Sequence, residues 1–314
     1  MTLRRSRTFA IQLLVSVAAV AIVAFFTFAS PSAPPHVIRF VPATLGDQPP
    51  GAVVLGREDG DLAVGLAVAP RGSRLLLVAT VFGQSGAGVG RLESRFEVAT
   101  SAGQTVSAAG SPCTPGCYQT TLTASGRPAS AAVIFNRRNR VRFTLPARWP
   151  APSGLALVRD AEAEYARLRT LVTHERLASD PTNAVYTTYY AVAPDRLRFQ
   201  VRGGVESIII GSERWDRQPG GSWQRSPQAP IEPIKPYWTP LVQDARIVGS
   251  AIVDGRPCWV IAFANPQTPG FFTIWLDKVD HRTLQLEMTA AAHFMHHTYG
   301  PFNAPFTVEP PTAG

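Results

Sequence analysis

The longest uninterrupted apolar run of the chain lies near its N-terminus. Residues Phe9–Ala29 read FAIQLLVSVAAVAIVAFFTFA and carry no charge. A helix of this length spans roughly 30 Å, the thickness of the hydrocarbon core of a bilayer. Arg4, Arg5 and Arg7 precede the run, and this asymmetry keeps an N-terminus in the cytoplasm. The pattern predicts a cytoplasmic tail (1–8), a transmembrane anchor (9–29) and an extracytoplasmic remainder; a cleaved signal peptide is the alternative.

After the predicted anchor, apolar residues occur in short runs rather than in one long run. Residues 30–50 are rich in proline and predict a stiff, extended spacer. From Gly51 to Pro146, runs such as LAVGLAVAP and RLLLVATVFG alternate with Gly, Pro and Ser. Their length and their β-branched residues predict strands, and no helical period interrupts them. We therefore expect an Ig-like β-sandwich over residues 51–148.

The segment Trp149-Pro-Ala-Pro-Ser marks the expected boundary of a second domain, 149–314. Leu155–Ala178 has apolar positions near helical spacing, and Asp180-Pro181 is expected to end that helix. The remainder alternates again and predicts about eight antiparallel strands. A sheet of this size must curl, with the helix over its concave side. The expected fold class is mainly β: a transmembrane helix, a sandwich, and an unclosed antiparallel β-barrel (a half-barrel) covered by one helix.

Composition narrows the function classes. Hydrophobic residues make up 45% of the 314 residues, enough for real cores, and charged residues only 17%. The net charge of +8 falls to about +5 without the three arginines before the anchor, and the remaining basic residues are scattered. This favours a solvated surface, with at most a mild attraction to an anionic membrane, and gives nucleic-acid binding little support.

An ordered set of motifs in the second half carries a resemblance to a known family. APDRLRF, SIIIGSERWDR, GSW, IVGSAIVDGRPCWVIAF and FFTIWLDKVDHRTLQLEMTA follow one another between Leu155 and Pro311. In order and content they resemble the LolA/LppX-like lipoprotein-carrier superfamily. The resemblance implies an unclosed β-barrel with helices over its mouth, and the binding of acyl chains or lipoproteins in the cell envelope.

The first half resembles, more loosely, the Ig-like domains of copper-resistance proteins (CopC- and YtkA-like). DLAVGLAVAPRGSRLLLVATVFGQSG and SPCTPGCYQTTL carry this resemblance. Gly51–Pro146 contains no His and no Met, so a copper site of the usual kind does not carry over to it.

Three cysteines bear on compartment and chemistry. Cys113-Thr-Pro-Gly-Cys117 places two thiols around a tight turn on the expected oxidising side of the membrane, which favours a small disulfide. Metal binding by the two thiolates is the weaker alternative. Cys258 lies in an apolar strand and is expected to be a buried free thiol.

Aromatic and sulfur side chains of the second domain are the candidate ligand contacts. An aromatic wall for an apolar ligand and an ordinary hydrophobic core are alternative interpretations, and a cup-shaped sheet allows both. Strand parity alone does not say which side chains face inward. The candidates are Phe199, Trp215, Trp223, Phe272, Trp275 and Met288.

His293, Met295 and His297 alternate on one predicted strand and therefore point to one face. Imidazole and thioether ligands suit Cu(I), so a copper-handling protein is an alternative function. A half-buried strand whose histidines bond their neighbours explains the same pattern.

Motifs of known catalytic chemistry are missing from the sequence: there is no HExxH, G-x-S-x-G, P-loop or G-x-G-x-x-G. We expect neither enzymatic activity nor a bound cofactor. The sequence predicts a membrane-anchored envelope protein that binds a lipid or another apolar ligand in its half-barrel. A sensor or scaffold that binds another envelope protein, without a small ligand, is the remaining alternative.

Overall fold

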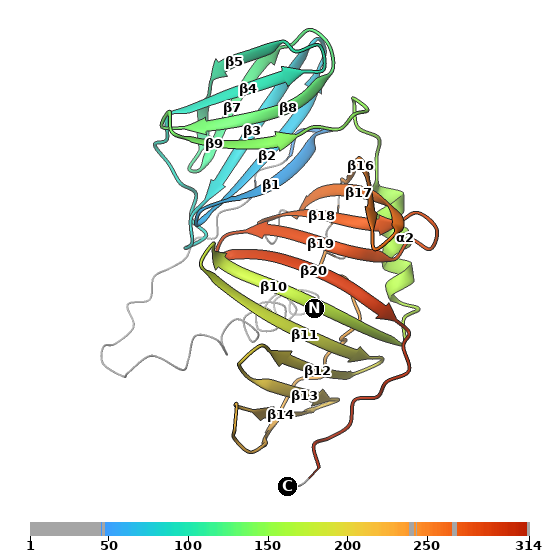
Figure 1. Cartoon of the computed structure of the whole chain (residues 1–314). Coiled ribbons are helices and arrows are strands. Elements are labelled where there is room, and N and C mark those ends of the chain that lie inside the picture. Colours follow the sequence, from blue (N-terminus) through green and yellow to red (C-terminus); the bar gives the residue numbers. More distant parts are fainter. Residues whose placement is uncertain (1–44, 46–47, 239–241, 243, 266–268, 313–314) are drawn as a thin grey trace, which may run out of the picture. The chain divides into compact units, whose positions relative to one another are not determined.

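The computed structural model describes residues 45, 48–238, 242, 244–265 and 269–312 (Figure 1). All of them belong to one compact unit, Phe40–Gly314. The predicted tail (1–8), anchor (9–29) and most of the spacer (30–50) lie outside the described residues. Within the described ranges, no helix is long and apolar enough to cross a membrane.

Nine strands between Val53 and Thr144 form two antiparallel sheets, ordered β1-β2-β3-β7-β6 and β5-β4-β8-β9 (Figure 1). Alternating apolar side chains of both sheets meet in one core that includes Leu66, Leu77, Phe96 and Phe143. This is the layered arrangement that the short alternating runs predict. The strands are β1 (Val53–Asp59), β2 (Leu62–Arg71), β3 (Arg74–Phe82), β4 (Ser94–Thr100), β5 (Thr105–Ala109), β6 (Ser111–Thr114), β7 (Cys117–Thr123), β8 (Pro128–Phe135) and β9 (Asn139–Thr144).

The only helix among the described residues, α2, is shorter than the sequence predicts. It runs from Leu155 to Tyr165 and buries Val158, Ala161 and Tyr165. The predicted continuation to Ala178 is wrong, because Thr170–Asp180 forms strand β10. The β-branched Thr170, Val172 and Thr173 favour a strand, and β10 pairs with β11 on one side and β20 on the other.

Eleven antiparallel strands, rather than about eight, form one open sheet. Its order is β15-β14-β13-β12-β11-β10-β20-β19-β18-β17-β16, so β15 and β16 are the two edge strands and the barrel is not closed; residues 152–154 bond to the start of β16. The strands that follow β10 are β11 (Asn183–Val192), β12 (Arg196–Val201), β13 (Glu206–Ile210), β14 (Glu213–Arg217), β15 (Gln224–Pro227), β16 (Arg246–Val253), β17 (Arg256–Asn265), β18 (Gly270–Asp277), β19 (Thr283–Ala290) and β20 (His293–Phe302).

One face of the open sheet, here called the inner face, is covered by α2 and by the segment 228–238. Tyr165 of α2 and Trp238 of the segment pack with Ile261, Phe263 and other side chains of β17–β20. Ile231 of the same segment packs on Phe199 and its neighbours at the other end of the sheet. The covering elements are thus one short helix and one proline-rich segment, not a second sheet.

The opposite, outer face of the open sheet packs against the sandwich. Ala63, Ala67 and Ala69 of β2 share a buried cluster with Phe271 of β18 and Phe294 of β20. The Phe271 ring lies so close to Gly65 that a Cβ there would overlap it. Small residues on β2 therefore let the two sheets approach closely.

Candidate functional site

Strand pairing determines which side chains the inner face presents. Leu171 packs in the cluster beneath α2, so alternation along β10 places Thr173, Glu175 and Leu177 on the same face. The register carries this parity to Tyr189 and Thr187 of β11, to Phe199 of β12, and to Met295, His297 and Tyr299 of β20.

Half of the inner face is an apolar core. Phe263 and Phe272 stack with ring centroids 5.4 Å apart, and Trp238 lies across Phe263 at 6.1 Å. Trp238 is fully buried, and Tyr165 meets it edge to face. Side chains therefore fill the hollow beneath α2.

A buried polar cluster crosses the middle of the same face. The Glu175 carboxylate accepts a hydrogen bond from His297 Nε2 at 2.7 Å and one from the Tyr189 hydroxyl at 2.9 Å. His297 Nδ1 lies 3.0 Å from the Tyr299 hydroxyl. Because β10 is paired with β11 on one side and β20 on the other, Glu175 is held directly opposite both Thr187 and His297.

The electrostatics of the cluster follow from burial and pairing. Burial by itself would raise the pKa of Glu175, but the hydrogen bond and charge of His297 and the hydrogen bond from Tyr189 outweigh it, so the pKa lies below its ordinary value. Burial raises the pKa of Tyr189, Tyr165 and Tyr299 well above that of a free tyrosine. The cluster thus holds an ionised carboxylate among neutral phenols.

Two donors near this cluster are buried without a hydrogen-bond partner among the described residues. They are the Tyr165 hydroxyl and the Trp238 indole N–H. Tyr165 interacts electrostatically with the hydroxyls of Tyr299 and Thr283, although neither meets hydrogen-bond geometry. An unpaired buried donor lowers the stability of the fold, so a hydrogen-bond acceptor placed beside it would be stabilising.

Between the core and the free edge β15, the inner face is only partly covered. Tyr237 exposes 54% of its surface although its ring contacts the fully buried His297, with centroids 5.1 Å apart. Half-buried apolar side chains continue along β10–β12 and β19 on this face: Leu177, Val185, Leu197, Val201 and Met288.

The structure separates the six predicted ligand contacts by face. Phe199, Phe272 and Met288 lie on the inner face. Trp275 lies on the outer face beside Cys258, because it alternates with Phe272 and Ile274 along β18. Trp215 and Trp223 also lie on the outer side, where Arg225 and Arg217 stack on their rings. These three tryptophans therefore do not line the inner face, because strand parity turns them away from it.

The predicted copper ligands share one face, as their spacing requires, but they are not free to act together. Both ring nitrogens of His297 are engaged, one by Glu175 and the other by Tyr299. Met295 is buried in the apolar core, and His293 is half-buried. Among the described residues, no three His, Cys, Asp or Glu side chains gather in a metal-binding arrangement. The arrangement fits the alternative in which the histidines bond their neighbours.

Cys113 and Cys117 form a disulfide at the β6–β7 turn. Cys258 is a buried free thiol, and burial raises its pKa. The thiol of Cys258 is therefore poorly placed to react or to bind a metal.

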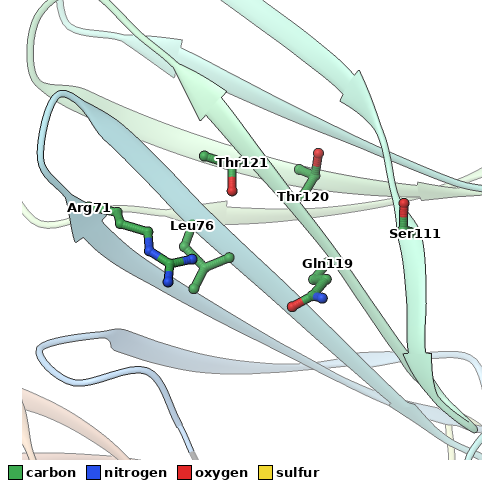
Figure 2. A pocket seen from close by; sticks show the side chains of 6 residues that line it. All are labelled: Arg71, Leu76, Ser111, Gln119, Thr120 and Thr121. Carbon is green, nitrogen blue, oxygen red and sulfur yellow. The ribbon is translucent and has the colours of Figure 1, made fainter.

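A shallow pocket of about 290 Å³ lies on the sandwich, over β2, β3, β6 and β7 (Figure 2). Its lining is polar apart from Leu76. Nothing about it favours an apolar ligand, so the inner face of the open sheet remains the candidate site.

Sequence reasoning missed Glu175, Tyr189, Tyr165 and Tyr299. Glu175 was expected on a helix, where its neighbours would have been one turn away rather than across a sheet. The signal was available in the alternation Leu171, Thr173, Glu175, Leu177, which places a lone carboxylate on an otherwise apolar strand face.

The solved structures that are similar to this chain include three that cover about half of it. LprF from Mycobacterium bovis is 13% identical, covering 52% of this chain and all of its own, with a TM-score of 0.40. The Mycobacterium tuberculosis lipoprotein LppX is 12% identical, covering 49% of this chain and 97% of its own, at 0.37. A DUF1329 family protein from Desulfovibrio piger is 9% identical, covering 49% and 92%, at 0.25.

No protein-family model matches the chain, and the comparison with curated proteins finds no relative. The copper-linked resemblance of the first half stays a prediction.

Proposed function

We propose that the chain is a binding protein that holds a lipid or another apolar ligand on the inner face of its open sheet. One observation carries this proposal: apolar side chains on β10–β12 and β19 remain half-buried on a face whose other half is a closed core. Each methylene that a ligand buries there contributes about 0.8 kcal/mol. The catalytic motifs are missing, so we propose binding rather than catalysis.

The polar cluster gives such a ligand an orientation. Glu175 and His297 satisfy each other, and Tyr165 and Trp238 are enclosed in the core, which leaves the 54% exposed Tyr237 as the side chain beside the cluster that a polar end can meet. An amphipathic ligand would lie with its chain along β10–β12 and its polar end near Tyr237.

We further propose that the protein acts outside the cytoplasm, tethered by Phe9–Ala29. The Cys113–Cys117 disulfide supports an oxidising compartment. Alkaline extraction of cell membranes tests the tether: an uncleaved anchor keeps the chain in the pellet, whereas a cleaved signal peptide releases a chain shorter by about thirty residues.

Native mass spectrometry of the fragment Phe40–Gly314, purified without detergent, tests ligand binding. We expect a bound mass of several hundred daltons that organic extraction removes. A ligand-free mass that also fails to take up added fatty acid or phospholipid would contradict the proposal. One bound copper ion would instead support the alternative copper site at His293, Met295 and His297.

Adjacent positions on β12 provide a matched pair of variants. Val201 is half-buried on the inner face, and Gln200 is exposed on the outer face. Val201→Glu places a charge in the proposed ligand path and should weaken binding of a fluorescent fatty acid at least tenfold. Gln200→Glu makes the same charge change away from the path and should leave binding unchanged.

A further inference from the structure

The positive charge of the chain is concentrated in the sandwich. Residues 48–148 contain eleven arginines, no lysine and five acidic residues, whereas residues 149–314 contain fifteen basic and sixteen acidic residues. The sandwich thus carries a net charge of +6 and the second half −1. Four of these arginines, Arg137, Arg138, Arg140 and Arg142, lie within six consecutive residues.

Five arginines lie on or beside the outer face of one sheet of the sandwich. Arg95 of β4 pairs with Ile134 of β8, which pairs with Arg140 of β9. The next row contains Glu97, Ala132 and Arg142 in the same order. Arg137 and Arg138 occupy the β8–β9 turn. We call Arg95, Arg137, Arg138, Arg140 and Arg142 the arginine face; all five are exposed.

Neighbouring carboxylates neutralise only part of this charge. Glu93 pairs with Arg137 at 3.0 Å, and Glu97 pairs with Arg140 at 2.7 Å. Arg138 and Arg142 make no ion pair with any described residue, and Arg95 bonds only the Ser107 hydroxyl. Three guanidinium groups, those of Arg95, Arg138 and Arg142, therefore have no carboxylate partner in the part of the chain that the structure describes.

The shape of the face favours a flat anionic partner. Between the arginines the strands carry short side chains, including Ser107, Ala109 and Ala132. A shallow hollow of about 310 Å³ lies among Glu93, Arg95, Ile134 and Arg137, large enough to admit a phosphate group. The other sheet of the sandwich packs on the open sheet through β1 and β2, so the arginine face is turned away from that contact.

We propose that the arginine face docks on an anionic phospholipid bilayer. Guanidinium groups match phosphate oxygens with two parallel hydrogen bonds, and a pleated face with short side chains allows several to reach one plane. The inference rests on the proposed function only for the tether. A chain as long as residues 30–50 can span up to about 70 Å, so the sandwich can reach the membrane in which we propose that Phe9–Ala29 is anchored.

Vesicle co-sedimentation of Phe40–Gly314 tests the proposal, because this unit contains every described strand but lacks the predicted anchor. We expect binding to phosphatidylcholine vesicles that contain 30 mol% phosphatidylglycerol, release by 0.5 M NaCl, and no binding to pure phosphatidylcholine. The variant Arg95→Gln/Arg138→Gln/Arg142→Gln should lose affinity on the order of a hundredfold.

A control variant with the same net charge distinguishes docking through the arginine face from a general electrostatic attraction of the protein to anionic vesicles. Arg71→Gln/Arg74→Gln/Arg169→Gln removes three exposed arginines that lie off the arginine face, and it should bind vesicles nearly as well as the parent. Equal losses in the two triple variants would overturn the proposal, as would no binding to anionic vesicles or tighter binding to a single-stranded oligonucleotide. Circular dichroism confirms that each variant folds.

The same variants keep the docking proposal distinct from the ligand proposal. The arginine-face variant should still bind a fluorescent fatty acid, and Val201→Glu should still bind anionic vesicles. Failure of the ligand experiment alone leaves docking supported. Vesicle binding that disappears in Val201→Glu would show that the inner face, not the arginine face, meets the membrane, and would overturn the docking proposal.

Discussion

The Glu175–His297 pair connects two central strands. It is so deeply buried that water cannot take the place of either partner. His297 is fully buried, and the Glu175 side chain is 6% exposed. Burying the Glu175 carboxylate costs free energy that its hydrogen bonds from His297 and Tyr189 offset. The pair therefore does little to raise total stability, but loss of one member leaves the other uncompensated.

Replacing Glu175 with Gln should destabilise the protein by about 3 kcal/mol, because His297 then loses its charged partner in the interior. Urea unfolding followed by tryptophan fluorescence measures the change. His174→Gln, on the exposed face of the same strand, should cost less than about 0.5 kcal/mol. Equal effects of the two changes would show that the pair is not energetically distinct.

His293 should make the protein sensitive to mild acid. Burial lowers its pKa below the ordinary value of 6.5, and the neighbouring His297 lowers it further. The unfolded chain therefore binds a proton before the folded one does, so stability is complete above pH 6.5 and falls as the pH drops toward the folded pKa. Thermal melts between pH 7.5 and 5 should show this fall, and His293→Gln should flatten it.

Glu175 acts in the same direction over a lower range. Its pKa is below the ordinary 4.5, so its contribution is complete above that value and is lost as the pH falls through the lowered folded pKa. A pH profile of His293→Gln that remains as steep as that of the parent above pH 5 would contradict the assignment to His293.

Among the elements, the β6–β7 hairpin depends most on a covalent link. β6 has four residues, all exposed, and pairs with β7 at the edge of its sheet. Its side chains contribute little burial, so the Cys113–Cys117 disulfide and the backbone bonds hold it. Helix α2 is stabilised mainly by burial of one face, since Gly154 at its N-cap has no side chain to cap it.

Replacing both cysteines with serine should lower the free energy of unfolding by about 2 kcal/mol, the loop-closure value for so short a loop. Thermal melts of the parent with and without dithiothreitol provide the matching measurement. The double variant should not respond to the reductant. A variant as stable as the oxidised parent would show that the turn residues alone hold the hairpin.

At the scale of the whole molecule, the seam between β2 and β18 joins the sandwich and the open sheet into one unit. Phe271 is buried against Gly65 and the alanines of β2. Close backbone approach of this kind depends on residues without bulky side chains.

Gly65→Ala should destabilise the protein by about 1–3 kcal/mol, because the new Cβ overlaps the Phe271 ring and forces the sheets apart. Calorimetry should also reveal two melting transitions where the parent has one. Gly249→Ala, in open space on β16, is the control and should melt like the parent. A single unchanged transition in Gly65→Ala would show that the seam does not couple the two regions.

Local pattern was sufficient for much of this fold. Alternation and turn residues predicted strands in both halves, an open antiparallel sheet with one helix, and the pairing of Cys113 with Cys117, because each depends on neighbours close in sequence. The anchor rests on hydropathy alone and stays a prediction. The predicted helix extended wrongly into Thr170–Asp180. Over these few residues the i, i+4 spacing coincides with alternation, and only the pairing with β11 and β20 favours a strand.

Tertiary structure decided the site. Glu175 and His297 are 122 residues apart, and only the placement of β20 beside β10 brings them to 2.7 Å. Likewise, the register turned Trp215, Trp223 and Trp275 to the outer face and Phe199, Phe272 and Met288 inward. The arginine face depends on tertiary structure only in part, because Arg137, Arg138, Arg140 and Arg142 are close in sequence and the pairing of β4 with β8 and of β8 with β9 adds only Arg95. Side-chain periodicity is a local property, but which faces meet depends on long-range pairing that no short segment encodes.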